Sequence, residues 1–516
     1  MSRLSREKDE ERVDFMHVDG SAHDASKRDP DLIQLGYVPE LVRNRSMSTI
    51  LFQSLAITAV PFGEGTALTS AIYGGGQLSY FVGWIVVSIL NQCLFMSLAE
   101  LCSKFPTSAG PYYFTYQLLP SGGKLRTLLS FITGWTWIIG NWTICLSVNF
   151  GFAALIAGTA TMYHPGWEAT AWELLLIFYA ICLGVFLIVA FGNRILPYVD
   201  TVASAWNAVT ILIVLIALSV KAGAGRHSAA YALGHYDKSF SGWGRFTFFI
   251  GLLPAAYTYA AIGMITSMAE ETTHPAIDVP RAMSWCIPIS FVAGLFFVLP
   301  ICFTLPPLED ILAAPLAQAV PFIFHTVMGS PGSGLALMFF VLGVALFCSI
   351  SITTAASRST WAFARDRAIP LSWIWSKIVI DTPTFALALV TLVQMLLGLI
   401  NLGSSSAFTA FASTGVIALA ASYGIPIAIS LFGGRSFVRQ AQWRLPSAIG
   451  FLFNAIAVVW VAFQLVLFSM PAALPVTIVS MNYASVVFVG LLALSMVYYI
   501  VFARKVYVGP PESDGL

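Results

Sequence analysis

This chain contains a series of twelve apolar segments, each about 20 residues or longer and therefore able to cross a bilayer. In lipid, a segment of this length must satisfy its backbone hydrogen bonds internally, which favours helices. Only 10% of the residues are charged, whereas a soluble chain has about a quarter. The sequence predicts an all-α polytopic membrane protein with twelve transmembrane helices. Their expected spans are 48–73, 79–102, 127–160, 171–191, 197–220, 245–268, 282–305, 333–357, 384–402, 406–432, 446–470 and 481–503.

The first of these segments is interrupted in a way that a plain membrane helix is not. Pro61, Gly63 and Gly65 stand within five residues of one another, and both residue types weaken a helix interior. Glu64 lies between the two glycines, and a carboxyl group near the middle of a bilayer is a functional-site candidate. We expect unwound backbone and a binding site here. The alternative is that the helix ends here and Glu64 meets water at the interface.

A second interrupted segment is the sixth, where Gly251, Pro254 and Gly263 fall inside a long apolar run. If segments 1–5 and 6–10 form two halves, each half opens with a broken helix, which is typical of inverted-repeat transporters with a site at the midplane. Tyr257 and Tyr259 flank the expected break and are candidates for contact with the solute. A proline kink with packing glycines is the alternative for this segment considered alone.

The chain divides into one transport unit and two polar tails. Residues 1–46 lack an apolar h-region and are expected to be a disordered cytoplasmic tail, not a signal peptide. The transporter domain, 47–508, is expected to contain a first repeat (47–221), a second repeat (245–432) and helices 11 and 12 (446–503), with 509–516 as a short cytoplasmic tail. Twelve spans would place 22 of the 26 lysines and arginines on the side of the termini. Both termini are therefore expected to be cytoplasmic.

Three short motifs follow predicted spans 2, 6 and 8. They are Ala99–Tyr113 (AELCSKFPTSAGPYY), Ala269–Ala282 (AEETTHPAIDVPRA) and the stretch from Ser357–Arg358 through WAFARD to Ile369–Pro370. Each resembles a signature of the amino acid/polyamine/organocation transporter superfamily at the expected helix. The resemblance, which runs from about residue 46 to 508, implies a LeuT-like 5+5 inverted repeat plus two C-terminal helices.

Within that superfamily the chain is most similar to the fungal amino acid/choline transporter branch, which includes choline and 4-aminobutyrate permeases. Tyr257-Thr258-Tyr259 and the region from Asn454 to Tyr483 carry this likeness. Many members of the branch have an acid after the second aromatic residue of span 6, where this chain has Gly263. Glu64 would supply the missing charge from the facing broken helix.

These observations give two sets of candidate residues. A carboxylate with aromatic faces suits the binding of a cationic amine, and Trp135 on span 3 could line the same cavity. The opposed charges at the cytoplasmic helix ends are expected to lie close together and to latch the inner mouth, with a plain topology-anchoring role as the alternative. The substrate-binding candidates are Gly63, Glu64, Gly65, Tyr257, Tyr259, Gly263 and Trp135. The gating candidates are Glu100, Lys104, Glu270, Arg281 and Arg358.

The sequence offers no catalytic chemistry. It has no nucleophile motif, no phosphate-binding loop, no basic patch for nucleic acid and no metal-ligand spacing, and its seven cysteines are dispersed. We therefore expect no enzyme, no cofactor and no metal. The resemblance implies a secondary active transporter that moves a small amine-bearing solute such as an amino acid, choline or 4-aminobutyrate, with a proton as coupling ion. The expected location is the plasma membrane, with the vacuolar membrane as alternative. An exporter and a non-transporting nutrient sensor of the same fold remain alternatives.

Overall fold

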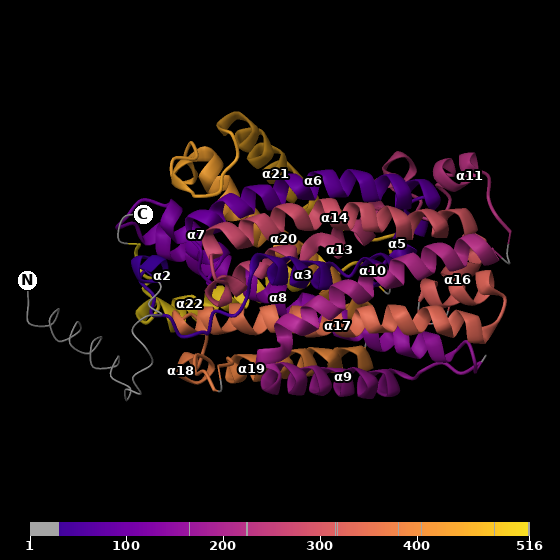
Figure 1. Ribbon diagram of the computed structural model, residues 1–516, viewed down its shortest axis with the longest axis horizontal. Coiled ribbons are helices and arrows are strands. Elements are labelled where there is room, and N and C mark those ends of the chain that lie inside the picture. Colours follow the sequence, from indigo (N-terminus) through magenta and orange to yellow (C-terminus); the bar gives the residue numbers. More distant parts are fainter. Residues whose placement is uncertain are drawn as a thin grey trace, which may run out of the picture.

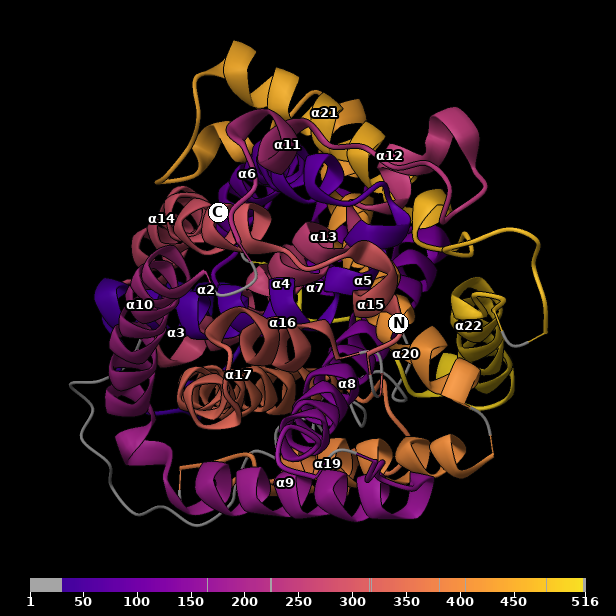
Figure 2. The same cartoon turned by 90° about the vertical axis from the view of Figure 1, so that its right-hand side faces the viewer.

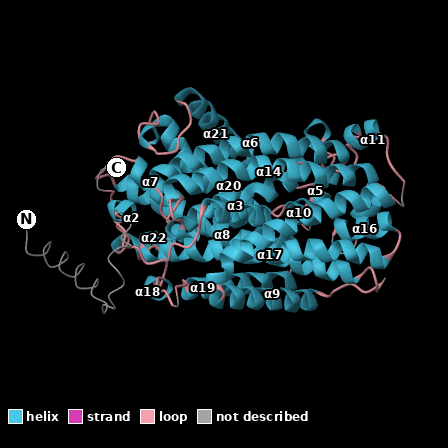
Figure 3. Ribbon diagram, in the orientation of Figure 1, coloured by secondary structure: helices cyan, strands magenta, loops and turns pink. Residues whose placement is uncertain are grey.

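The computed structural model describes residues 30–513 except 165, 223–224, 315, 317, 380, 404 and 479. Within this part of the chain every regular element is a helix, and the only β-type pairings are two isolated bridges, Arg45 with Thr272 and Val379 with Thr382. The long helices run side by side along the long axis of the molecule (Figures 1 and 3). An all-helical bundle is the arrangement expected of apolar segments that must satisfy their own backbone groups in lipid.

Eleven helical segments of the described chain are long and apolar enough to cross a membrane. They are α6 (Gln77–Lys104), α8 (Lys124–Ala160), α9 (Ala171–Phe191), η2 with α10 (Asn193–Lys221), the segment Gly244–Glu271, α14 (Pro275–Thr304), α17 (Pro331–Arg365), α19 with η6 (Thr384–Leu402), the Ser413–Phe432 part of α20 (Ser405–Phe432), α21 (Ser447–Leu467) and α22 (Ala484–Val501). They correspond to the second through twelfth predicted spans.

The first predicted span is divided into three helices, each too short to cross a membrane alone. These are α3 (Met47–Thr58), α4 (Val60–Thr66) and α5 (Leu68–Tyr73). The chain turns at Ala59, whose φ of 41° and ψ of 53° are left-handed, and again at Ala67. The predicted interruption is confirmed, but its predicted place is wrong. Pro61 lies in the first turn of α4, where proline is tolerated because the missing N–H has no helical acceptor, so Gly63 and Gly65 remain helical.

The sixth segment is also broken. It consists of η3 (Gly244–Phe246), α12 (Thr247–Ile250), α13 (Leu253–Ala260) and the tighter 3₁₀ helix η4 (Ile262–Glu271). Pro254 again lies in a first turn, that of α13, and the change of helix type follows Ala260. Both interruptions predicted from proline and glycine are therefore present.

Short helices complete the chain at the two ends of the bundle. They are α2 (Pro30–Gln34), α7 (Pro111–Leu118), α11 (Ala229–Gly234), α15 (Leu308–Leu312), α16 (Ala319–Met328), α18 (Ser372–Trp375), η7 (Val438–Gln440) and η8 (Ala503–Lys505). The first and last described segments lie together, because the amide of Gln117 donates to the Pro511 carbonyl at 2.8 Å and Tyr113 donates to the Leu35 carbonyl at 2.9 Å. We call this end the terminal side. The other end, which carries α11 and α16, is the opposite side (Figure 1).

The two broken segments occupy the middle of the bundle. In the end-on view, α4, α5 and α13 lie inside a ring that includes α6, α8, α10, α14 and α17, whereas α9, α19, α21 and α22 lie on the outside (Figure 2). Burial agrees with this arrangement, since 83% of the most apolar window of α8 is buried but only 11% of that of α22. The outer helices therefore supply the lipid-facing surface, and the inner ones enclose the broken pair.

Candidate functional site

A cavity of about 590 Å³ opens beside the two broken segments. Its walls come from the α4–α5 junction, α8, the start of α9, α13, the segment before α16, η6 and α20. The exposed Ala171, which lines it, places the mouth on the opposite side. We call it the central cavity. Binding sites for small molecules usually measure about 300 to 1,000 Å³, so this volume suits one small solute.

The wall of the central cavity is neutral. None of the described residues that line it carries a charged side chain; instead it combines hydroxyl groups with aromatic surface. Tyr257 of α13 lines it, with its phenol oxygen 2.9 Å from the Ser147 hydroxyl of α8. The other hydroxyl-bearing residues of the wall are Thr66, Thr69, Ser70 and Ser413. Such a surface offers hydrogen bonds and the aromatic side chains of Tyr257 and Phe150, without an attached counter-ion.

Glu64 lies elsewhere. Its side chain is fully buried and is absent from the cavity wall. The Thr258 hydroxyl lies 3.2 Å from its Oε1, and its Oε2 has no hydrogen-bond partner among the described residues. No lysine, arginine or histidine of the described chain forms an ion pair with it. The predicted carboxyl group is thus buried inside the bundle, and the α4–α13 contact separates it from the central cavity.

The three candidate glycines serve close packing. A Cβ atom on Gly63 would lie 2.4 Å from the Thr258 hydroxyl, and one on Gly65 would lie 2.7 Å from the Val320 side chain. A Cβ atom on Gly263 would lie 2.5 Å from the Tyr423 ring. The missing side chains let α4 approach α13 and α16, and let η4 approach α20. None of the three lines the central cavity.

Two aromatic candidates also lie away from the cavity. The Tyr259 ring stacks on Trp84 with centroids 4.8 Å apart, and its hydroxyl is 2.9 Å from that of Ser88, so it belongs to the α6 interface. Trp135 packs against Trp142, Phe363 and Tyr498 at centroid distances of 6.3, 6.0 and 6.2 Å. Of the seven substrate-binding candidates, only Tyr257 lines the central cavity.

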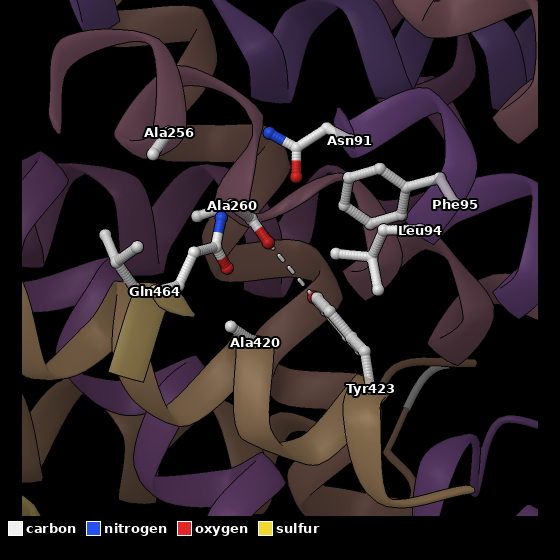
Figure 4. Close-up of a pocket in the computed structure, with 9 residues that line it drawn as sticks. Asn91, Leu94, Phe95, Ala256, Ala260, Ala420, Tyr423 and Gln464 are labelled. Atoms are coloured by element: carbon white, nitrogen blue, oxygen red, sulfur yellow. Dashed lines mark hydrogen bonds between the residues drawn. The ribbon is translucent and has the colours of Figure 1, made fainter. Parts of the chain in front are cut away.

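A second, much smaller cavity lies behind the end of α13. It measures about 10 Å³, room for about one water molecule, and Asn91, Tyr423 and Gln464 contribute polar groups to it (Figure 4). The Tyr423 hydroxyl donates to the Ala260 carbonyl at 3.2 Å. This space is too small for an amino acid, so we assign it to the packing around the change from α13 to η4.

The terminal side is closed by a buried ion-pair network. Glu271 accepts from Arg358 at 2.7 Å and from Arg45 at 3.1 Å, and Arg45 also pairs with Asp200 at 2.8 Å. Both arginine side chains have zero exposure. Asn193 accepts a further bond from Arg358 at 2.6 Å. The network joins the start of α3 to α10, η4 and α17, so it holds together the terminal ends of both broken segments.

The predicted gating acids are all engaged, but with other partners than expected. Glu100 pairs with Arg435 at 2.7 Å, whereas Lys104 donates to the amide of Gln440 at 3.0 Å. Glu270 holds Arg365 through two bonds of 2.9 Å. The expected closeness of the acids at the predicted cytoplasmic helix ends to Arg358 is confirmed by its pair with Glu271, whereas the pairing of these acids with Lys104 and Arg281 is not found among the described residues. The arginines that pair with Glu100 and Glu270 lie far away in sequence, whereas Arg281 is exposed and pairs with no acid of the described chain.

Several residues of the site were missed from sequence. Asp200 could have been identified from the sequence, because it is an acid inside a predicted span. Ser147 gave no such signal, and Thr258 stands out only as the middle residue of Tyr257-Thr258-Tyr259. Single hydroxyl groups are common on membrane helices and bond back to their own turn, as Thr258 does to the Pro254 carbonyl. Arg45 carries no signal beyond being one of several basic residues near the first span.

Asp366 ties the first described segment to this side of the bundle. Its Oδ2 accepts from the Tyr37 hydroxyl at 2.8 Å and from the Tyr112 hydroxyl at 2.6 Å. Burial raises the pKa of Asp366 to about 6, against the lowering effects of neighbouring Arg365 and the two phenols. Between about pH 4 and about pH 6, the Asp366 carboxyl group is therefore protonated in a larger fraction of folded molecules than of unfolded ones.

This pKa gives a testable pH dependence. As the pH falls through about 6, protonation relieves the cost of burying the charge, so this residue favours the folded state progressively more down to about pH 4. Asp366→Asn removes the titration and keeps the shape. We expect the rise in apparent melting temperature between about pH 7.5 and about pH 5 to be smaller in Asp366→Asn than in the parent protein, as measured in detergent. Exposed Asp310→Asn is the control, and identical pH profiles for parent and Asp366→Asn would contradict the assignment.

Comparison with known proteins gives a consistent result over almost the whole chain. Residues 48–492 match the family model described as amino acid permease. Amino-acid permease BAT1 of Arabidopsis thaliana is 29% identical over 496 residues, covering 93% of this chain and 95% of the relative. The polyamine transporter TPO5 of Saccharomyces cerevisiae is 28% identical over 453 residues (86% and 73%). The choline transporter of the same yeast is 26% identical over 478 residues (92% and 84%).

Proposed function

The chain belongs to the amino acid permease family of the amino acid/polyamine/organocation superfamily, and from this premise we propose that it carries a small amine-bearing solute by alternating access. Membership makes it a multi-pass membrane transporter and not an enzyme, and implies the LeuT-like fold. The observation that carries the proposal is a solute-sized central cavity, open on the opposite side, above an ion-pair network that closes the terminal side. Alternating access requires each state of a transporter to be open at one end and closed at the other.

The chemistry of the cavity supports an amine as the recognised group. Tyr257 offers an aromatic face, which attracts an ammonium group, and the surrounding hydroxyls can accept its hydrogen bonds. The named relatives include an amino-acid permease, a polyamine transporter and a choline transporter, whose printed solutes all contain an amine or a quaternary nitrogen. We propose the same class here, with choline and 4-aminobutyrate among the first solutes to test.

Further parts of the proposal rest on the sequence. The two broken segments open the proposed repeats, 47–221 and 245–432. The charge bias of the loops supports a cytoplasmic terminal side, which makes the state described here outward-open. A proton is the proposed coupling ion and the plasma membrane the proposed location. The buried ion pairs of Glu100, Glu270 and Arg358 are proposed to form the inner gate, which must separate when the terminal side opens.

Uptake into proteoliposomes tests the proposal with a panel of radiolabelled choline, 4-aminobutyrate, arginine and spermidine. An aromatic face contributes about 0.5 to 2 kcal/mol to binding a cation, which corresponds to about 2- to 30-fold in affinity. We therefore expect Tyr257→Ala to raise the apparent KM of the transported solute by that factor, and Tyr257→Phe to have a smaller effect. Tyr198→Ala is the control, because Tyr198 is 74% exposed on α10. Wild-type kinetics in Tyr257→Ala would remove this ring from the solute site.

A further inference from the structure

Glu64 is a buried carboxyl group that does not line the central cavity and has no part in the proposed binding of the solute. Glu64 and Tyr257 lie on the two broken segments that face each other, yet they point to different places. Tyr257 points into the central cavity, whereas Thr258, the next residue, points to Glu64. The α4–α13 contact, in which Gly63 meets Thr258, therefore separates the carboxyl group from the solute space.

The hydrogen bonds around Thr258 indicate which form of Glu64 fits this place. The Thr258 hydroxyl lies 2.9 Å from the Pro254 carbonyl and 3.2 Å from Glu64 Oε1. A hydroxyl group has one proton to donate, and a carbonyl oxygen can only accept. If Thr258 donates to Pro254, its own oxygen is left to accept from Glu64, which requires a protonated carboxyl group.

The surroundings of Glu64 also favour the neutral form. The titratable groups that face it are Tyr80 of α6, Tyr259 of α13 and Cys302 of α14, none of which supplies a positive charge. Glu64 Oε2 and the Tyr80 hydroxyl are both buried without a partner in the described chain. An ionised carboxylate buried without a cation is strongly unfavourable, and the group instead takes up a proton.

We propose that Glu64 is a proton-binding site distinct from the solute cavity and linked to it through the α4–α13 contact. With the proton bound, the neutral carboxyl group allows α4 to pack against Thr258 as seen here. Loss of the proton would leave a charge in this contact and favour a state in which the two segments separate and Glu64 meets water. The proton enters from one aqueous phase and leaves to the other, and no bond other than the carboxyl O–H is made or broken. This inference rests on the proposed function for its role in coupling, but not for the protonation itself.

The protonation is tested without any solute. The infrared spectrum of purified protein near neutral pH should contain a carbonyl band of a protonated carboxylic acid that is lost in Glu64→Gln and kept in Glu64→Asp. Exposed Glu309→Gln is the control and should leave the band unchanged. Absence of the band from the parent protein would overturn the proposal, whatever the protein transports. Size-exclusion profiles establish that each variant is folded.

The separation from the solute is tested by exchange in proteoliposomes, with the member of the choline, 4-aminobutyrate, arginine and spermidine panel that the parent protein moves. We expect Glu64→Gln to exchange this solute with an affinity within about twofold of the parent, and to lose both gradient-driven accumulation and the pH dependence of exchange. Tyr257→Ala should show the reverse pattern, with weaker affinity and a retained pH profile. A loss of solute binding in Glu64→Gln would place the carboxyl group against the solute and overturn the inference, while the parent's own exchange would leave the proposed function standing.

Discussion

Replacing Gly63 by alanine is expected to abolish transport. The added Cβ atom would lie 2.4 Å from the Thr258 hydroxyl and 3.1 Å from its Cα atom, so the α4–α13 contact could form only after a backbone shift. Overpacking of this kind costs about 1 to 3 kcal/mol where the structure can adjust, and here it acts at the contact between the two moving segments. Uptake by purified, reconstituted Gly63→Ala measures the effect.

Gly184→Ala is the matched control for this prediction. No atom lies within 4 Å of the position that its Cβ would take, and the residue lies within α9 on the outside of the bundle. Alanine is the better helix former, so this variant should be folded and fully active. Full transport by Gly63→Ala would show that the close approach of α4 to α13 is dispensable.

Replacing Glu271 by alanine should have a comparably large effect on the terminal side. It removes the acid shared by Arg45 and Arg358, two side chains with zero exposure, and an unpaired buried charge costs about 3 to 5 kcal/mol. We expect a marked fall in apparent melting temperature and more frequent opening of the terminal side to water. All seven cysteines are buried in this state, so faster reaction with a maleimide would report the opening.

The exposed pair of Arg194 and Asp381 is the control for the charge network. Its charged atoms are 3.9 Å apart, and the side chains are 87% and 46% exposed. Surface pairs of this kind contribute about 0 to 1 kcal/mol, and asparagine tolerates the left-handed backbone of Asp381 (φ 57°), so Asp381→Asn should differ little from the parent in stability and labelling. Equal effects of Glu271→Ala and Asp381→Asn would argue against the network as the closing element.

The parts of the fold that the sequence predicted are those set by local chemistry. Span lengths follow from apolar runs, and the two broken segments follow from proline and glycine inside such runs. The sequence does not give the exact position of the break in the first span, because a proline can stand either within an unwound stretch or in the first turn of the next helix. Pro61 and Pro254 both take the second position, and the turn at Ala59 carries no sequence signal.

The parts that it did not predict depend on how helices face one another. Tyr257, Thr258 and Tyr259 point to the cavity, to Glu64 and to Trp84, because successive residues of a helix are turned by about 100°. The spacing of residues along the sequence gives the relative directions of their side chains, but not which neighbouring helix each side chain contacts. The charge partners were missed for the same reason, since Arg435 meets Glu100 across 335 residues of chain.

Proton-coupled movement of an amine-bearing solute is the function proposed for this permease. Its most direct test is the distribution of the radiolabelled panel across proteoliposomes under an imposed pH gradient, with the pH of the medium recorded. We expect accumulation above the external concentration, movement of protons with the solute, and loss of both when the gradient is collapsed. Saturable binding without accumulation, or fluxes equal to those of protein-free vesicles, would contradict it.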